Sequence, residues 1–150
     1  MRTNQPQTIY LSEYKVPAYL VDQVDLRFEL FEDGARVHST LTVRRNPDSA
    51  ESAAPLFLHG DSLQLESVSL NGSPLGTGEF EDRGDALVVP SVPEEFELQV
   101  VTWIEPQNNT RLEGLYKSSG MFCTQCEAEG FRCIPSIRTG RMSWRASVPV

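Results

Sequence analysis

The chain has 150 residues, enough for one domain with a sizeable core, and 39% hydrophobic and 23% charged residues are typical of a soluble globular protein. Its net charge of -8 argues against a nucleic-acid partner, because phosphate contacts need clustered lysine and arginine. No apolar run approaches the roughly 18 residues that span a bilayer, and the N-terminus has no apolar signal-peptide core, so we expect a cytoplasmic protein without a membrane partner.

Alternating apolar and polar residues predict two long strands near the start. In YLVDQVDLRFELF (residues 19–31), Val24, Leu26, Phe28 and Leu30 fall on one face, and charged residues fall on the other. EDG follows, and an Asp-Gly pair favours the positive φ of a tight hairpin turn. ARVHSTLTVRR (residues 35–45) then alternates again.

Shorter segments continue the pattern. LFLHG (56–60), LQLESVSL (63–70) and ALVVP (86–90) are predicted strands, and NGSP from Asn71 is a second hairpin signal. FELQVVTWIEP (96–106) alternates clearly, and no helix is predicted before residue 107. Short strands separated by turn residues predict an all-β domain, either an antiparallel sandwich or a curved sheet.

The character of the sequence changes in residues 108–132. This segment has poor periodicity and several glycines, and we expect a long, ordered loop after the sheet. Ordered loops on a rigid scaffold are common positions for binding groups, so a functional site is expected near this end of the domain.

All three cysteines fall at the end of this segment. Cys123 and Cys126 form a C-x-x-C pair, but a structural zinc site usually needs four ligands, and only Cys133 follows, while His38 and His59 lie far upstream in predicted strands. A thioredoxin-like redox site would need a βαβ unit. The favoured interpretation is that the cysteines pack as small apolar side chains, and a small zinc protein is a less favoured alternative.

Acidic and amide side chains alternate in the same segment. If the chain there is extended, Gln125, Glu127 and Glu129 point to one side. Such a cluster suits a cationic group such as an ammonium, through charge-assisted hydrogen bonds. The alternative from the residues alone is a solvated acidic loop.

Several segments resemble one known family. NNTRLEGLYKSSGMFCTQCEAEGFR, YKVPAYLVDQVDLRFEL and LFLHGDSLQLESVSLNG resemble the first domain of bacterial aminopeptidase N, the alanyl aminopeptidase family of zinc exopeptidases, over about residues 8–132. The resemblance implies a β-rich, saddle-like domain with a loop that reaches over a catalytic domain. It also implies an enzyme that releases single residues from the free N-terminus of peptides.

The resemblance assigns roles to two residues. Gln125 and Glu127 match a Gln and a Glu that line the pocket for the substrate's first residue, with the Glu binding the α-ammonium. Glu129 has no such assignment. In the family an H-E-x-x-H motif and a later Glu hold the zinc, and neither that motif nor G-A-M-E-N occurs here. We therefore expect no catalytic residue and no zinc ligand in this chain, and no hydrolysis without the missing catalytic domain. The alternative is a stand-alone β-sandwich module that binds a peptide or cationic ligand.

The final residues depart from the family. After Arg132 the chain has three arginines and no acid, and one codon choice for residues 136–145, read two bases later, encodes a family-like D-R-P-D-V-M-A. We therefore expect a truncated β domain over residues 1–132 and an aberrant, out-of-frame tail over residues 133–150. A natural divergent C-terminus is the alternative.

Overall fold

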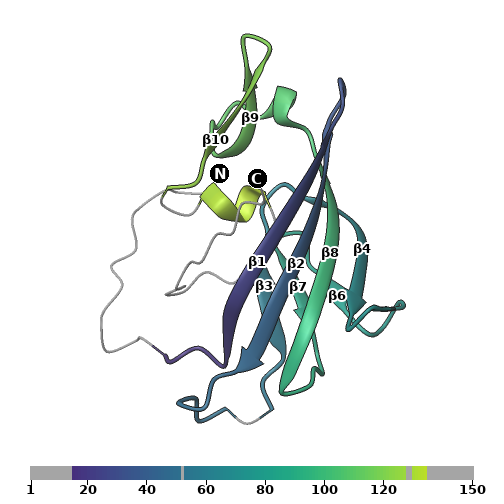
Figure 1. The fold of residues 1–150 in the computed structure, drawn as a ribbon, viewed down its shortest axis with the longest axis vertical. Helices are drawn as coiled ribbons and strands as arrows, with labels where there is room; N and C mark the ends of the chain where they lie inside the picture. The colour runs from purple at the N-terminus through teal and green to yellow at the C-terminus, as the bar shows by residue number, and fades with distance from the viewer. Residues whose placement is uncertain (1–14, 52, 128–129, 135–150) are drawn as a thin grey trace.

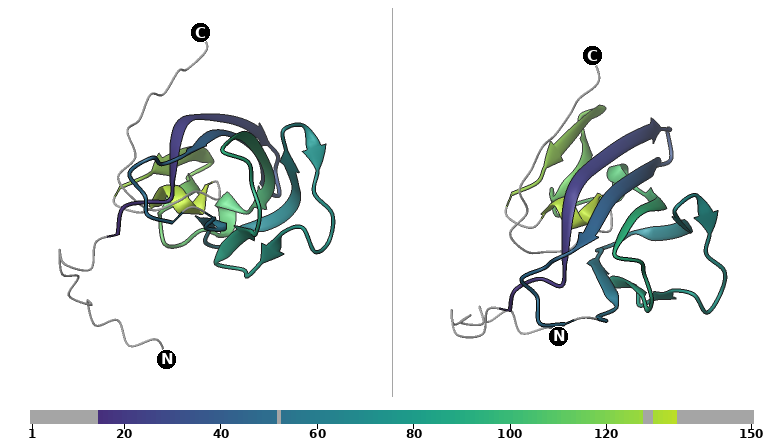
Figure 2. Two further views of the ribbon diagram at one scale, coloured as in Figure 1. Left: turned by 90° about the horizontal axis from the view of Figure 1, so that it is seen from below. Right: turned by 60° about the horizontal axis from the view of Figure 1, so that its bottom comes forward.

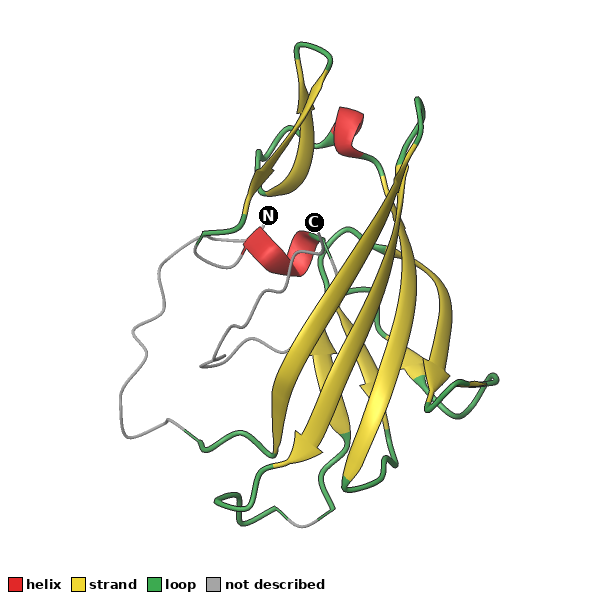
Figure 3. Cartoon of the chain, viewed as in Figure 1, coloured by secondary structure: helices red, strands yellow, loops and turns green. Residues whose placement is uncertain are grey.

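A computed structural model gives the fold, and it describes residues 15–51, 53–127 and 130–134 (Figure 1). Antiparallel β-strands dominate these residues, and the helical elements within them are two short 3-10 turns, η2 (Pro106–Asn108) and η3 (Gly130–Cys133) (Figure 3). The all-β prediction is therefore confirmed.

The strands form three sheets. The largest has the order β1-β2-β8-β4-β5, the second β3-β7-β6, and the third is the β9–β10 hairpin. The strands are β1 (Tyr19–Leu30), β2 (Ala35–Arg45), β3 (Leu56–His59), β4 (Gln64–Leu70), β5 (Ser73–Pro74), β6 (Glu81–Asp82), β7 (Ala86–Val89), β8 (Glu95–Ile104), β9 (Gly114–Ser118) and β10 (Met121–Gln125).

The main core lies between the five-stranded and three-stranded sheets. Alternate residues of β8 are buried along its whole length, as the sequence pattern predicts. Leu98 of β8 lies opposite Leu41 of β2, and both are 0% exposed. Leu58 and Leu87 of the smaller sheet pack into the same cluster, which gives the two-layer arrangement of a sandwich.

A second, smaller core cluster lies at the other end of β2 and β8. Its buried members are Ala35, Val37, Ile104, Leu115 and Ile134. Since Leu115 belongs to β9 and Ile134 directly follows η3, this cluster attaches the hairpin to the large sheet (Figures 1 and 2). The packed structure continues through Ile134, which is 2% exposed, and residues 135–150 of the predicted tail lie outside the described residues.

The turn that joins β1 and β2 differs from its prediction. The hairpin forms, with the Phe31 amide donating to the Gly34 carbonyl at 2.8 Å, but Gly34 does not have a positive φ. A Cβ at Gly34 would instead overlap the ring of Trp103, which stacks on Phe31. Glycine is required here for close approach of a side chain rather than for backbone conformation.

The apolar face of β1 is only partly covered. Val24 and Leu26 are half-buried, as expected of a half-buried strand. Phe28 and Leu30, predicted on the same core face, are 37% and 49% exposed. The alternation predicts the correct face of β1, but no described side chain covers Phe28 and Leu30 fully.

Candidate functional site

The segment predicted as a long loop is mainly a β-hairpin. Gly114–Ser118 form β9, and a two-residue turn leads directly into β10. Both turn residues have positive φ, 49° at Ser119 and 83° at Gly120, which is the geometry of a type I′ turn. The Ser-Gly pair was the sequence signal for this hairpin, and it is weaker than Asn-Gly.

The two predicted site residues lie where β10 ends. Gln125 is the last residue of β10 and pairs with Gly114, whereas Glu127 lies in the turn that follows. The extended conformation stops at Gln125, so the predicted alternation does not continue to Glu127, and Glu129 lies outside the described residues. Both described side chains are exposed.

Tight backbone packing fixes the position of Gln125. A Cβ at Gly130 would lie 2.5 Å from the Gln125 carbonyl oxygen and 3.3 Å from the Gly114 amide nitrogen. Gly114 itself has a φ of +74°, and a Cβ there would lie 2.7 Å from the Cys133 Cβ. The start of η3 therefore packs directly against the ends of β9 and β10, and this holds the chain around Gln125 in place.

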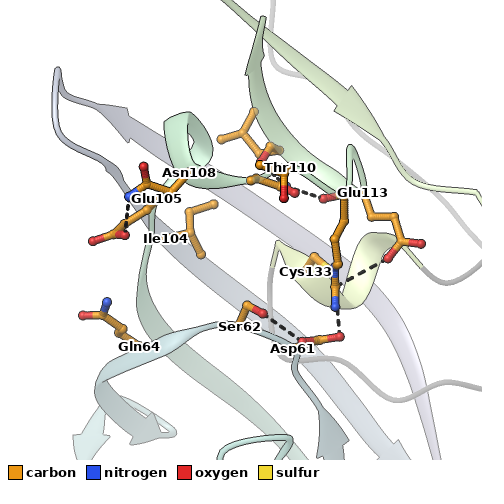
Figure 4. A pocket seen from close by; sticks show the side chains of 12 residues that line it. Asp61, Ser62, Gln64, Ile104, Glu105, Asn108, Thr110, Glu113 and Cys133 are labelled. Atoms are coloured by element: carbon orange, nitrogen blue, oxygen red, sulfur yellow. Dashed lines mark hydrogen bonds and ion pairs between the residues drawn. The ribbon is translucent and has the colours of Figure 1, made fainter. Parts of the chain in front are cut away.

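A polar pocket of about 290 Å³ lies between the β3–β4 connection, η2 and η3 (Figure 4). The guanidinium of Arg111 organises one side of it. Its Nη2 lies 3.0 Å from an Asp61 carboxylate oxygen, 3.5 Å from a Glu113 carboxylate oxygen and 3.1 Å from the Cys133 sulfur. Ser62 donates a further hydrogen bond to Asp61, at 2.9 Å. A charge-paired network therefore forms this side of the pocket.

Burial and pairing act on the acid–base groups of this network in opposite directions. Partial burial alone would raise the pKa of Asp61, but hydrogen bonds from Arg111 and Ser62 and the Arg111 charge hold the pKa below its ordinary value. Burial raises the pKa of the Cys133 thiol, against the opposing effect of Arg111. The Asp61 carboxylate is therefore the ionised partner, and the Cys133 thiol is the neutral one.

We expect Asp61→Asn to lower the free energy of unfolding at pH 7 by less than about 1 kcal/mol, because the pair is partly exposed. Because the pKa of Asp61 is lower in the folded than in the unfolded protein, its ionised carboxylate stabilises the fold at pH values above the unfolded-state pKa. This stabilisation is lost as the pH falls through the folded-state pKa. The difference between the two proteins should thus shrink below pH 3.8, the ordinary aspartate pKa. Urea unfolding at several pH values measures it, with the exposed Asp48→Asn as the control. A difference that persists unchanged in acid would contradict the assignment.

The cysteines and histidines do not assemble a metal site within residues 15–51, 53–127 and 130–134. No three His, Cys, Asp or Glu side chains in these ranges form a group that could hold a metal ion. His38 lies in β2 and His59 in β3, which belong to different sheets. Cys133 is buried, as expected for a small apolar side chain, but Cys126 is exposed, so that interpretation fails for Cys126.

In the described part of the chain, no helix has the length and hydropathy needed to cross a membrane.

Solved structures with the same arrangement of strands define a class. Aminopeptidase A of Legionella pneumophila superposes with a TM-score of 0.75 at 31% identity, over 81% of this chain and 14% of that one. An M1 zinc metallopeptidase of Deinococcus radiodurans superposes with a TM-score of 0.63 at 16% identity, over 80% of this chain and 29% of that one, which shows the shared fold alone. The fold is that of a β domain found in M1 aminopeptidases.

Sequence comparison is more specific. The chain is 40% identical over 134 residues to aminopeptidase N of Caulobacter vibrioides and 43% identical over 132 residues to aminopeptidase N of Escherichia coli. These alignments cover 89% and 88% of this chain but only 15% of each relative. No family model matches. The chain is therefore homologous to a segment of bacterial aminopeptidase N, as its motifs indicate.

Proposed function

We propose that this chain is the N-terminal β domain of a cytoplasmic zinc aminopeptidase that releases N-terminal amino acids from peptides. The observation that carries the proposal is the 40–43% identity to aminopeptidase N over nearly nine-tenths of the chain. The enzymatic chemistry would belong to a catalytic domain outside these 150 residues, because H-E-x-x-H is absent from them. The described residues do not fit a zinc site, and we assign no zinc-dependent step to them.

The role proposed for this chain is recognition of the peptide's amino end. Glu127 supplies a carboxylate to the substrate α-ammonium, and Gln125 supplies an amide group to the same pocket. An exopeptidase must distinguish a charged chain end from a neutral mid-chain amide, and a carboxylate does so by charge. In favour of this role, both side chains are exposed, and the backbone of Gln125 is held between Gly114 and Gly130.

We also propose that residues 133–150 arise from a shifted reading frame. The change in charge after Arg132 and the family-like motif in the other frame support this. Sequencing the gene across residues 132–136 and the DNA downstream tests it. A single intact frame without the shifted motif would overturn the frameshift, and an H-E-x-x-H frame downstream would support the enzymatic parent.

The purified chain should not hydrolyse an alanyl chromogenic substrate, with or without added zinc. The physical reason is that it provides substrate contacts but no metal-bound water and no general base. Release of the chromophore is measured against intact Escherichia coli aminopeptidase N as the active control. Zinc-dependent turnover that copurifies with the chain would contradict the prediction.

The role of Glu127 can be tested in a chimera, in which residues 8–132 replace the homologous segment of Escherichia coli aminopeptidase N. Glu127→Gln in an active chimera should lower kcat/KM for an alanyl substrate by about 10- to 100-fold, the value of one charge-assisted hydrogen bond. The effect arises because the amide is neutral and cannot balance the ammonium charge.

The matched control in the same chimera is Glu95→Gln. Glu95 is an exposed glutamate at the opposite end of β8 from Ile104, and therefore far from the hairpin. The Glu95→Gln substitution should leave kcat/KM unchanged. An active chimera that tolerates Glu127→Gln equally well would remove the proposed role of Glu127 while leaving the homology intact.

A further inference from the structure

Within the described part of the chain, β1 is a long edge strand of the large sheet. It is the outermost of five strands and has 12 residues, whereas β5 at the opposite edge has two (Figure 1). Among the described strands, β1 pairs with β2 alone. An edge of this kind presents unpaired backbone N–H and C=O groups that can bind another strand. The register is irregular between Val21 and Gln23, and the strand is regular from Gln23 to Leu30.

The regular part of β1 is complementary to itself. When two copies are placed antiparallel about a two-fold axis at Leu26, Asp25 lies opposite the partner's Arg27, and Arg27 lies opposite the partner's Asp25. On the other face, Val24 lies opposite the partner's Phe28. Every direct pair between residues 23 and 29 then joins two apolar residues, two opposite charges, or an amide and a carboxylate.

The required side chains are available at the surface. The Arg27 side chain is 74% exposed and bridges only its own Glu29 at 2.6 Å among described acids. Asp25 accepts a hydrogen bond from Gln23 at 2.5 Å and has no ion pair with a described residue. Phe28 is 37% exposed although it faces the core side of the sheet. A second copy would supply the missing cation for Asp25 and the missing apolar neighbour for Phe28.

Other axes are less favourable. An axis at Asp25 places Asp25 opposite the partner's Asp25, and an axis at Arg27 places like charges opposite each other at both Arg27 and Asp25. An axis at Phe28 is charge-matched through Arg27 and Glu29, but β1 ends at Leu30, so only residues 26–30 would pair. Within the regular stretch Gln23–Leu30, the axis at Leu26 gives the longest overlap without a like-charge pair.

We propose that two copies of this chain pair through β1, antiparallel about a two-fold axis at Leu26, and form one sheet that runs through both copies. The contact is isologous, so it closes at the dimer rather than growing into a filament. This inference concerns the chain as a separate polypeptide and does not depend on the proposed function.

Sedimentation equilibrium of the purified chain tests the proposal. The expected result is a concentration-dependent mass that rises from 16.8 kDa to a plateau at twice that value. Arg27→Glu and Asp25→Arg each place like charges opposite at two positions of the interface, and each should raise the dimer dissociation constant by about 10-fold or more. The double variant Asp25→Arg/Arg27→Glu reverses both signs and should restore dimerisation.

Arg83→Glu is the matched control. Like Arg27, Arg83 forms an exposed ion pair with a glutamate two positions away in the sequence, Glu81, at 2.8 Å. Arg83→Glu also changes the net charge by the same amount as Arg27→Glu. It should leave the dissociation constant unchanged. Circular dichroism of each variant confirms the fold, and hydrogen exchange should show amides between Gln23 and Glu29 that lose protection on dilution.

Three results would overturn the proposal. A mass of 16.8 kDa at every concentration would show that β1 does not pair with a second copy of this chain. Aggregates without a plateau would exclude a closed two-fold contact. A dimer that Arg27→Glu does not weaken, or that the double variant does not restore, would use a different surface.

Discussion

Leu98→Ala is expected to lower the free energy of unfolding by about 3 kcal/mol, within the 2–5 kcal/mol range for truncation of buried leucines. Leu98 is 0% exposed in the middle of β8, and it lies opposite Leu41 on one side and Leu70 on the other. The substitution removes apolar contacts and leaves a cavity that the paired strands on both sides cannot close. Urea unfolding followed by circular dichroism measures the change.

Leu112→Ala provides the control for this substitution. Leu112 is 53% exposed, and the same atoms are removed without creating a buried cavity. The free energy of unfolding should change by no more than about 0.5 kcal/mol. Equal losses of stability for Leu98→Ala and Leu112→Ala would contradict the burial of Leu98 between the two sheets.

Gly114→Ala should destabilise the protein by about 2–4 kcal/mol, because two unfavourable effects add. The φ of +74° disfavours any residue with a Cβ, and the new atom would crowd the Cβ and carbonyl oxygen of Cys133, 2.7 and 3.1 Å away. These neighbours belong to a packed turn and cannot move independently. The fold of β9 against η3, and with it the position of Gln125, should be disturbed.

Gly120→Ala separates these two effects. Gly120 has a similar φ of +83°, but a Cβ there meets nothing within 4 Å. Only the conformational cost remains, about 1–2 kcal/mol. Thermal or urea unfolding of both variants gives the comparison. If Gly114→Ala costs no more than Gly120→Ala, the crowding against Cys133 is not real.

The strands and tight turns of the large sheet could be predicted because local patterns determine them, whereas its strand order depends on pairing between distant segments. Along β8, burial of alternate side chains follows directly from the alternation of apolar and polar residues. The Asn71-Gly72 turn has positive φ at both residues, 50° and 79°, so the NGSP hairpin forms by the mechanism that the sequence indicates. In both cases the information lies within a few neighbouring residues.

The remaining features depend on residues far apart in the chain. Gly34 is required by Trp103, which approaches it across the sheet, and an Asp-Gly pair carries no sign of this. Phe28 follows the apolar alternation of its strand, but its exposure depends on what packs above it. The β9–β10 hairpin is short, and apart from the buried Gly114 and Leu115 its residues are exposed or half-buried, so it lacks the alternation that revealed the longer strands.

The candidate site residues Gln125 and Glu127 were proposed from a motif rather than from a periodic pattern. The resemblance selected Gln125 and Glu127, and the structure places them at the end of a hairpin instead of in an extended loop. The Arg111–Asp61 pair beside the pocket was not predicted, because its partners are 50 residues apart and neither stands in a recognisable motif.

The two separate core clusters have a consequence for how the β9–β10 hairpin can vary in sequence. The hairpin that carries Gln125 rests on the smaller cluster, around Leu115 and Ile134, while the larger cluster stabilises the two-layer body. Substitutions on the hairpin can therefore change the orientation of its end with little loss of stability in the main core. The hairpin and the two-layer body are in this sense separate units of variation.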